Sequence, residues 1–221
     1  MAEKDTISNP KRFFILWGMI LAVVFLATIA GNFALAMLVK TRSENDPRLH
    51  ILAAQKHLAE KRYSDARLEI DRALVLTPTS PEPYMLSGHL HYDAQQWEDA
   101  IADYRTAIGY GSGDQYVDGR ILWCLIHLRR FDEAAEYGRA SLASGRGTSS
   151  LKSDTAEAYR RAGKLAEAKS FFEMALSDSP GSVDLMERLK GVCQAMGDQQ
   201  EVAAIQSRID GVRSTLEAPS R

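Results

Sequence analysis

Histidine and cysteine are the side chains of this sequence best suited to metal binding or nucleophilic catalysis, and the histidine spacing argues against a metal site. His89 and His91 are separated by one residue. On a helix that spacing points the two rings to different faces, so they cannot share one metal ion. His50 and His127 have no companion at a metal-ligand spacing. We therefore expect no metal and no cofactor.

Catalytic motifs are missing from the sequence as well. It contains no nucleophile elbow of the form G-x-S-x-G, no H-E-x-x-H pair and no P-loop. The glycine-rich stretch 109–113 follows no strand pattern and is interpreted as a connector between helices. An enzyme is therefore the least favoured class, and we expect no catalytic residue and no small-molecule substrate.

The elements that must position these side chains begin with an apolar run near the amino terminus. Residues 13–39 are 27 consecutive positions without a charge. At about 1.5 Å per residue, such a helix spans roughly 40 Å, more than the ~30 Å hydrocarbon layer of a bilayer. The sequence predicts a transmembrane helix over 13–39, a polar segment over 1–12 before it and a short linker over 40–46 after it. Small residues that could form a packing face within the membrane are Gly18, Ala22, Ala27 and Gly31, although Gly and Ala are common in such spans.

A cleaved secretory signal is the competing interpretation of the same run. Ala34-Leu35-Ala36 has the small-x-small form of a cleavage site, with the cut after Ala36. An apolar core much longer than the roughly 7–15 residues of a signal peptide favours an uncleaved anchor. Basic residues are nearly balanced on its two sides, so orientation stays open. We expect a single-pass protein of a bacterial inner membrane, with the following domain leaning to the periplasmic side.

Beyond the apolar run, the sequence repeats with a period of 34 residues. Units beginning at 47, 81, 115 and 149 align without a gap. Small residues at one phase let two helices approach closely, and bulky residues at another fill the space beside the crossing. The small residues at phase 20 are Ala66, Ala100, Ala134 and Ala168, and the bulky residues at phase 17 are Tyr63, Trp97, Phe131 and Leu165. Such a period predicts stacked helix pairs, a solenoid.

The pattern resembles the tetratricopeptide repeat family, whose units have small residues at phases 8, 20 and 27, bulky residues at phases such as 17 and 24, and Pro at phase 32. Phase 8 is Ala54, Gly88, Leu122 and Ala156, so the third unit matches least well. With the apolar run, the resemblance implies an all-α chain in which a single transmembrane helix precedes a tetratricopeptide α-solenoid. Its parts are four repeats over 47–182 (47–80, 81–114, 115–148 and 149–182), a degenerate pair of capping helices over 183–213 and a tail over 214–221.

Cysteine placement follows from the same register. Cys124 and Cys193 fall on the first helices of units two apart, which puts them about 20 Å from one another if each unit adds a helix diameter. A disulfide needs Cα atoms within about 7 Å. We therefore expect two buried free thiols.

The resemblance also points to a binding surface. In this family, first helices build a concave wall, and phases 2, 5, 9, 12 and 13 are free of core packing. In the second and third units these phases carry aromatic, Met and His side chains, a composition typical of peptide-binding hot spots. The predicted protein-binding groove contains Met85, His89, Tyr92, Tyr116, Trp123, Ile126 and His127. The alternative is that Trp123 and Ile126 belong to the core, because Leu122 at phase 8 suggests a rotated or shifted helix.

The predicted function is therefore a membrane-anchored scaffold that binds a segment of a partner protein in this groove and helps to assemble a membrane-associated complex. The short linker favours partners that are membrane-embedded or membrane-proximal, and lipid contacts the anchor. The alternative is a structural accessory subunit held mainly through its transmembrane helix. A net charge of −2 without a concentrated basic face argues against nucleic acid as a partner.

Overall fold

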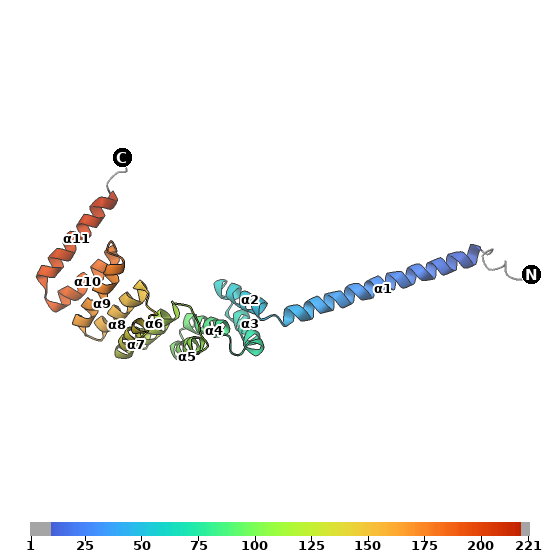
Figure 1. The fold of residues 1–221 in the computed structure, drawn as a ribbon, viewed down its shortest axis with the longest axis horizontal. Helices are drawn as coiled ribbons and strands as arrows, with labels where there is room; N and C mark the ends of the chain where they lie inside the picture. Colours follow the sequence, from blue (N-terminus) through green and yellow to red (C-terminus); the bar gives the residue numbers. More distant parts are fainter. Residues whose placement is uncertain (1–9, 218–221) are drawn as a thin grey trace, which may run out of the picture. The chain divides into compact units, whose positions relative to one another are not determined.

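The computed structural model describes residues 10–217, and every regular element in that range is an α-helix (Figure 1). The chain divides into two compact units between Leu49 and His50. Each unit is described by itself below.

The first unit is built on α1, a helix of 35 residues from Pro10 to Glu44. Its described apolar side chains between Trp17 and Met37 are exposed. Among the described residues, no helix has the length and hydropathy needed to cross a membrane. The structure therefore does not support the predicted span, in which the side chains of residues 13–16, 18, 20, 22, 38 and 39 lie outside the described ones.

Two further predictions concern this unit. Of the small-residue face, the side chains at 18 and 22 lie outside the described ones, while Ala27 and Gly31 are exposed. Residues 40–44 of the predicted linker belong to α1, so only Asn45 and Asp46 separate it from the next helix at Pro47. Pro47 disfavours the helical conformation in the residue before it, which accounts for the break. The Asp46 carboxylate accepts a 2.9 Å bond from the Arg48 N–H at the new helix start.

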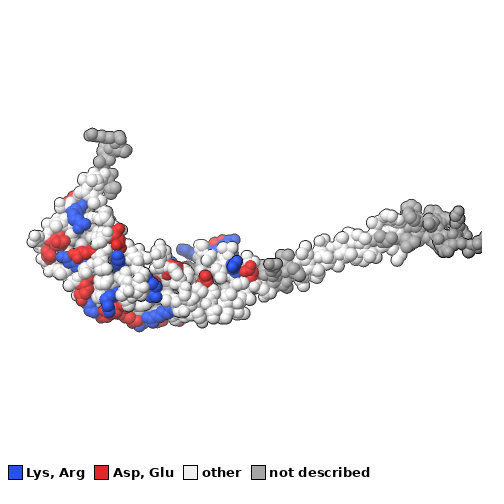
Figure 2. Space-filling view, viewed as in Figure 1, with Lys and Arg blue, Asp and Glu red and all other residues white. Residues whose placement is uncertain are grey.

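From Pro47 onward, helices alternate between a first and a second helix of each pair, in the all-α solenoid that the sequence predicted. The first helices are α2 (Pro47–Ala59), α4 (Pro81–Asp93), α6 (Val117–His127), α8 (Ser149–Arg161) and α10 (Val183–Met196). The second helices are α3 (Tyr63–Leu76), α5 (Trp97–Gly109), α7 (Phe131–Ala143), α9 (Leu165–Asp178) and α11 (Gln199–Glu217). Figure 2 shows charged side chains of both signs interspersed on the visible face of these helices.

The turn inside each pair has one conformation in all five pairs. A residue with φ between 57° and 79° follows each first helix at phase 15: Lys61, Gln95, Arg129, Gly163 and Gly197. A left-handed residue after a helix lets the next N–H groups bond its last carbonyls, and glycine adopts it without strain. The fifth pair, which looked degenerate in sequence, keeps this turn.

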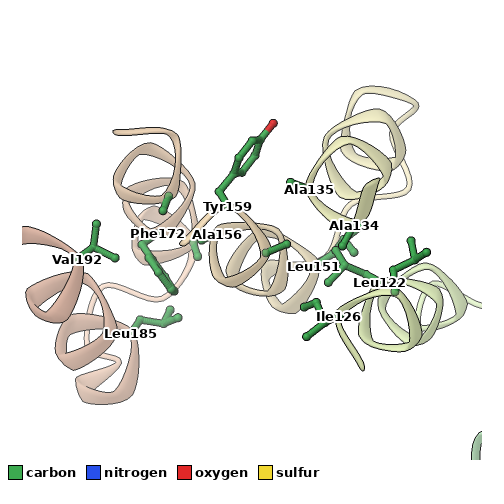
Figure 3. Close-up of a cluster of buried hydrophobic side chains, with 14 of the residues drawn as sticks. Leu122, Ile126, Ala134, Ala135, Leu151, Ala156, Tyr159, Phe172, Leu185 and Val192 are labelled. Carbon is green, nitrogen blue, oxygen red and sulfur yellow. The ribbon is translucent and has the colours of Figure 1, made fainter. Parts of the chain in front are cut away.

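The solenoid core runs through the helix crossings (Figure 3). All four phase-20 alanines are fully buried. In the second pair, a Cβ on Gly88 would lie 2.5 Å from the ring of Tyr104, so the small residue at phase 8 makes room for the large one at phase 24. The third pair reverses these sizes, because Leu122 stands at phase 8 and a Cβ on Gly138, at phase 24, would lie 2.8 Å from it. The reversal explains the poor match of that unit.

Both cysteines are buried and free, as the repeat register predicted. Burial raises the pKa of the Cys124 thiol to about 12, so the thiol stays protonated and unreactive in the folded chain.

Candidate functional site

Aromatic side chains of α4, α5 and α6 form one contiguous group, which we call the aromatic cluster: Tyr92, Trp97, Trp123 and His127. Tyr92 meets Trp97 edge to face, with ring centroids 5.3 Å apart. His127 stacks on Trp97 at 4.4 Å with an interplanar angle of 10°, and Trp123 lies 6.3 Å from His127. The Arg120 guanidinium covers the Tyr92 ring at 5.5 Å, close enough for a cation–π contact. Three of the predicted groove residues are thus brought together around Trp97, which the prediction did not include.

The other predicted groove residues lie outside this cluster. Tyr116 is the residue before α6 and is 60% exposed, with its N–H bonded to the Asp114 carboxylate at 2.8 Å. Met85 is partly buried and accepts a hydrogen bond from the Ser112 hydroxyl. Ile126 is only 2% exposed. Its place in the groove was wrong, because its side chain packs into the core (Figure 3).

His89 is partly buried against Tyr104, with ring centroids 5.7 Å apart. Burial, together with the positive charge of Arg120, lowers the pKa of His89 to about 4. Its buried Nε2 atom has no hydrogen-bond partner. The ring is therefore neutral at physiological pH and acts as packing between α4 and α5.

A cavity of about 420 Å³ opens beside Trp123, and all of its lining comes from the first helices α6, α8 and α10. We call it the arginine pocket, with the lining residues Trp123, Glu157, Arg160, Arg161, Arg188 and Gly191. Trp123 belongs to both the pocket and the aromatic cluster. The two features are therefore continuous along successive first helices.

Glu157 organises the arginine pocket. Its side chain is only 10% exposed. Arg160 donates to it from Nε at 2.8 Å and from Nη2 at 2.7 Å, and Arg161 donates from Nε at 2.7 Å. These charge-assisted bonds lower the pKa of Glu157, although burial opposes them, so Glu157 is ionised. A buried carboxylate thus fixes two guanidiniums on one turn of α8.

A second carboxyl group of α8, that of Asp154, lies near Trp123 but is not part of the cavity lining. Asp154 lies between α8 and α6, where one of its oxygens would be 3.7 Å from a Cβ on Gly119. Burial raises the pKa of Asp154 to about 6, and hydrogen bonding to Trp123 and the charge of Arg188 limit that rise. Trp123 therefore contacts an acidic group, Asp154, and lines the same cavity as the paired arginines.

Of the residues that line the arginine pocket, only Trp123 was predicted from the sequence; the charged residues were missed, although their signal was present. Glu157, Arg160 and Arg161 stand at phases 9, 12 and 13 of the fourth unit, the same phases that were used for the second and third units. The groove was predicted from the aromatic, Met and His side chains of the second and third units, so these three residues of the fourth unit were not included. Across the described part of the chain, no group of three or more His, Cys, Asp or Glu side chains is arranged to hold a metal ion.

Comparison with known proteins supports the repeat assignment. A family model described as tetratricopeptide repeat matches residues 85–149. No curated protein matches the chain. Among solved structures, MamA from Desulfovibrio magneticus RS-1 is 13% identical with a TM-score of 0.68, over 78% of this chain and 97% of MamA.

Two further structures have a similar fold. YrrB, described as a TPR protein with an unusual peptide-binding site, is 15% identical with a TM-score of 0.65, over 80% of this chain and 92% of YrrB. PilF of Pseudomonas aeruginosa is 18% identical with a TM-score of 0.61, over 78% of each chain. The helical array that follows α1 is therefore an all-α solenoid similar in fold to tetratricopeptide repeat structures, and the family model matches it over residues 85–149.

Proposed function

We propose that this chain is a scaffold that binds a segment of a partner protein along the surface formed by α4, α6, α8 and α10. The observation that carries the proposal is the continuity of the aromatic cluster with a cavity of about 420 Å³ through the shared residue Trp123. Aromatic and arginine side chains are the residue types enriched at protein-binding hot spots. YrrB, which has a similar fold, is described as a peptide-binding protein.

The test is recovery of partner proteins with a tagged full-length chain after mild detergent extraction of its native membranes. We expect the double variant Trp123→Ala with His127→Ala to lose partners that the wild-type chain retains. Val75→Ala is the control, because it removes a highly exposed apolar side chain on the second helix α3, outside the surface. Circular dichroism shows whether each variant keeps its helices. Equal recovery by the wild-type chain and the double variant would contradict the proposal.

We further propose that α1 anchors the scaffold in a membrane and that its partners are membrane-embedded or membrane-proximal. Support comes from the uncharged run over residues 13–39 and from the exposure of Phe25, Leu26 and Phe33 in α1. Exposed large apolar side chains on a helix are costly in water and favourable in lipid. Carbonate extraction of membranes tests this, since release of the chain into the soluble fraction would refute anchoring. Protease accessibility in spheroplasts then decides whether the solenoid is periplasmic, as proposed.

Replacing α1 with an unrelated membrane span distinguishes the scaffold from a subunit held mainly by its anchor. The scaffold proposal expects partner recovery to persist after the replacement, because the binding surface lies in the solenoid. Loss of all partners would favour the anchor as the main contact.

A further inference from the structure

The residues that line the arginine pocket include more cations than anions. Its lining contributes three cations, Arg160, Arg161 and Arg188, against one anion, Glu157. Asp184 pairs with Arg188 at 2.9 Å from outside the lining, and that pair is exposed on α10. Asp154, also outside the lining, forms a hydrogen bond with Trp123, and the charge of Arg188 acts on it. With these two neighbours the carboxylates equal the cations in number, so the feature that sets this cavity apart is the set of guanidinium N–H donors that α8 and α10 bring to its lining.

The two guanidiniums on α8 keep donors available after they bind Glu157. A guanidinium has five N–H donors in a planar fork. Arg160 uses its Nε and one hydrogen of Nη2, and Arg161 uses its Nε alone. Because Glu157 is buried and holds both, the remaining N–H groups are positioned in advance for an acceptor. Planar, bidentate binding of a carboxylate is the recognition for which arginine is best suited.

An ion pair on α7 shows that this arrangement is more than ordinary helix-surface pairing. Arg139 contacts Glu136 through the same two nitrogens at the same three-residue spacing. There the acidic side chain is 52% exposed, no second arginine joins it, and it borders no described cavity. In the arginine pocket the carboxylate is largely buried, and a cavity with an indole ring lies beside it.

From this geometry we propose that the arginine pocket binds the carboxylate of an Asp or Glu side chain in an acidic partner segment, with a neighbouring apolar side chain of the same segment on Trp123. The inference rests on the proposed binding function and specifies the chemistry of the partner. The acidic residue is selected because its carboxylate can accept the guanidinium N–H groups of Arg160 and Arg161 that Glu157 leaves unused. The indole of Trp123 selects a neighbouring apolar residue, because it lines the same cavity as the arginines of α8.

The test uses fluorescein-labelled peptide pools and the full-length chain in detergent, read out by fluorescence anisotropy. One pool carries a fixed Glu next to a fixed Leu or Phe within randomised neutral positions. Matched pools replace the Glu with Gln, with Lys or with phosphoserine. We expect the dissociation constant of the Glu pool to be about ten-fold lower than that of the Gln pool, which is the effect of one hydrogen-bonded charge pair.

Arg188→Met is the main variant, because Arg188 pairs with Asp184 and not with Glu157. A thermal melt accompanies it, because the charge of Arg188 also acts on partly buried Asp154. The variant should lower Glu-pool affinity to the level of the Gln pool and leave Gln-pool binding unchanged. Arg188→Glu should weaken the Glu pool further and favour the Lys pool. Arg139→Met on α7 is the control and should alter neither pool. Arg160→Met is a second variant, accompanied by a thermal melt because it removes a partner of buried Glu157.

The outcomes separate this inference from the proposed function. Equal binding of the Glu and Gln pools, both weakened by Trp123→Ala, would overturn the acidic-segment inference and leave the binding surface standing. Absence of binding by the Glu pool at millimolar concentration would also overturn the inference, while partner recovery still tests the function separately. Tighter binding of the phosphoserine pool than of the Glu pool would replace the carboxylate with a phosphorylated segment.

Discussion

Gly138→Ala tests whether the reversed crossing in the third pair is as tightly packed as its geometry indicates. The added Cβ would lie 2.1 Å from the Thr155 hydroxyl oxygen, 3.0 Å from its Cβ and 2.8 Å from a methyl group of Leu122. Thr155 and Leu122 are both fully buried, so neither side chain can turn into solvent. The Thr155 hydroxyl also donates a 2.7 Å bond to the Leu151 carbonyl, which holds it in place.

The expected free-energy change is the difference of two opposing effects. Overpacking of a buried site costs typically 1–3 kcal/mol. Alanine in place of glycine inside a helix recovers roughly 0.5–1 kcal/mol. We expect Gly138→Ala to lower the free energy of unfolding by about 1–2 kcal/mol. For a domain of this size, the midpoint of thermal unfolding should fall by about 2–8 °C.

The measurement is thermal and urea unfolding of the full-length chain, followed by circular dichroism at the helix band. Gly211→Ala in α11 is the matched control, because nothing lies within 4 Å of its added Cβ, and it should be neutral or stabilising. Adding Thr155→Ala to Gly138→Ala should recover part of the loss, since contacting residues are not additive. A Gly138→Ala variant as stable as the wild-type chain would refute the packing argument.

Three other predictions concern pH, a buried carboxylate and a thiol. The pKa of His89 is about 4 in the folded chain and near 6.5 in the unfolded chain, so between these pH values the unfolded chain binds more protons. The free energy of unfolding should therefore fall by up to about 3 kcal/mol as the pH drops from 6.5 to 4. Urea unfolding at each pH should show a smaller fall for His89→Phe. Tyr137→Phe removes a 2.7 Å bond to buried Asp118 and should cost about 2 kcal/mol in urea unfolding, whereas an unchanged midpoint would show that other donors suffice. Cys124 should react with a thiol reagent only in denaturant, so rapid labelling of the native chain would disprove its burial.

The repeat register was predictable because single positions determine it. A helix crossing at short distance tolerates only a small side chain, so Ala66, Ala100, Ala134 and Ala168 mark each crossing without any knowledge of their neighbours. The all-α solenoid followed from that periodicity. The end of α1 was less predictable, because Ser43 and Glu44 do not stop a helix. The helix ends at Glu44, just before the residues whose helical conformation Pro47 disfavours.

The third pair shows what one position cannot reveal. Leu122 looked like a departure from the pattern at phase 8. The helix crossing, however, constrains the combined volume of the side chains at phases 8 and 24, and not the size of either one. Gly88 with Tyr104 and Leu122 with Gly138 are two divisions of a similar space. Reading the two phases as a pair would have predicted a helix in register. It would not have placed Ile126 in the core, because phase 12 belongs to the groove in that register, and only the structure shows that Ile126 is buried.

The candidate site needed the structure for a different reason. Phase rules assign a side chain to a face, but they do not say whether neighbouring side chains fill the space in front of it. Next to Trp97 the aromatic rings fill it, as the stacking of His127 at 4.4 Å shows. On α10, a Cβ added to the exposed Gly191 would meet nothing within 4 Å. On α8, Arg160 and Arg161 are hydrogen-bonded to Glu157. A cavity remains there because the side chains around it are either absent or tied down, and this is why the proposed contact with an acidic partner lies on α8 and α10 instead of within the aromatic cluster.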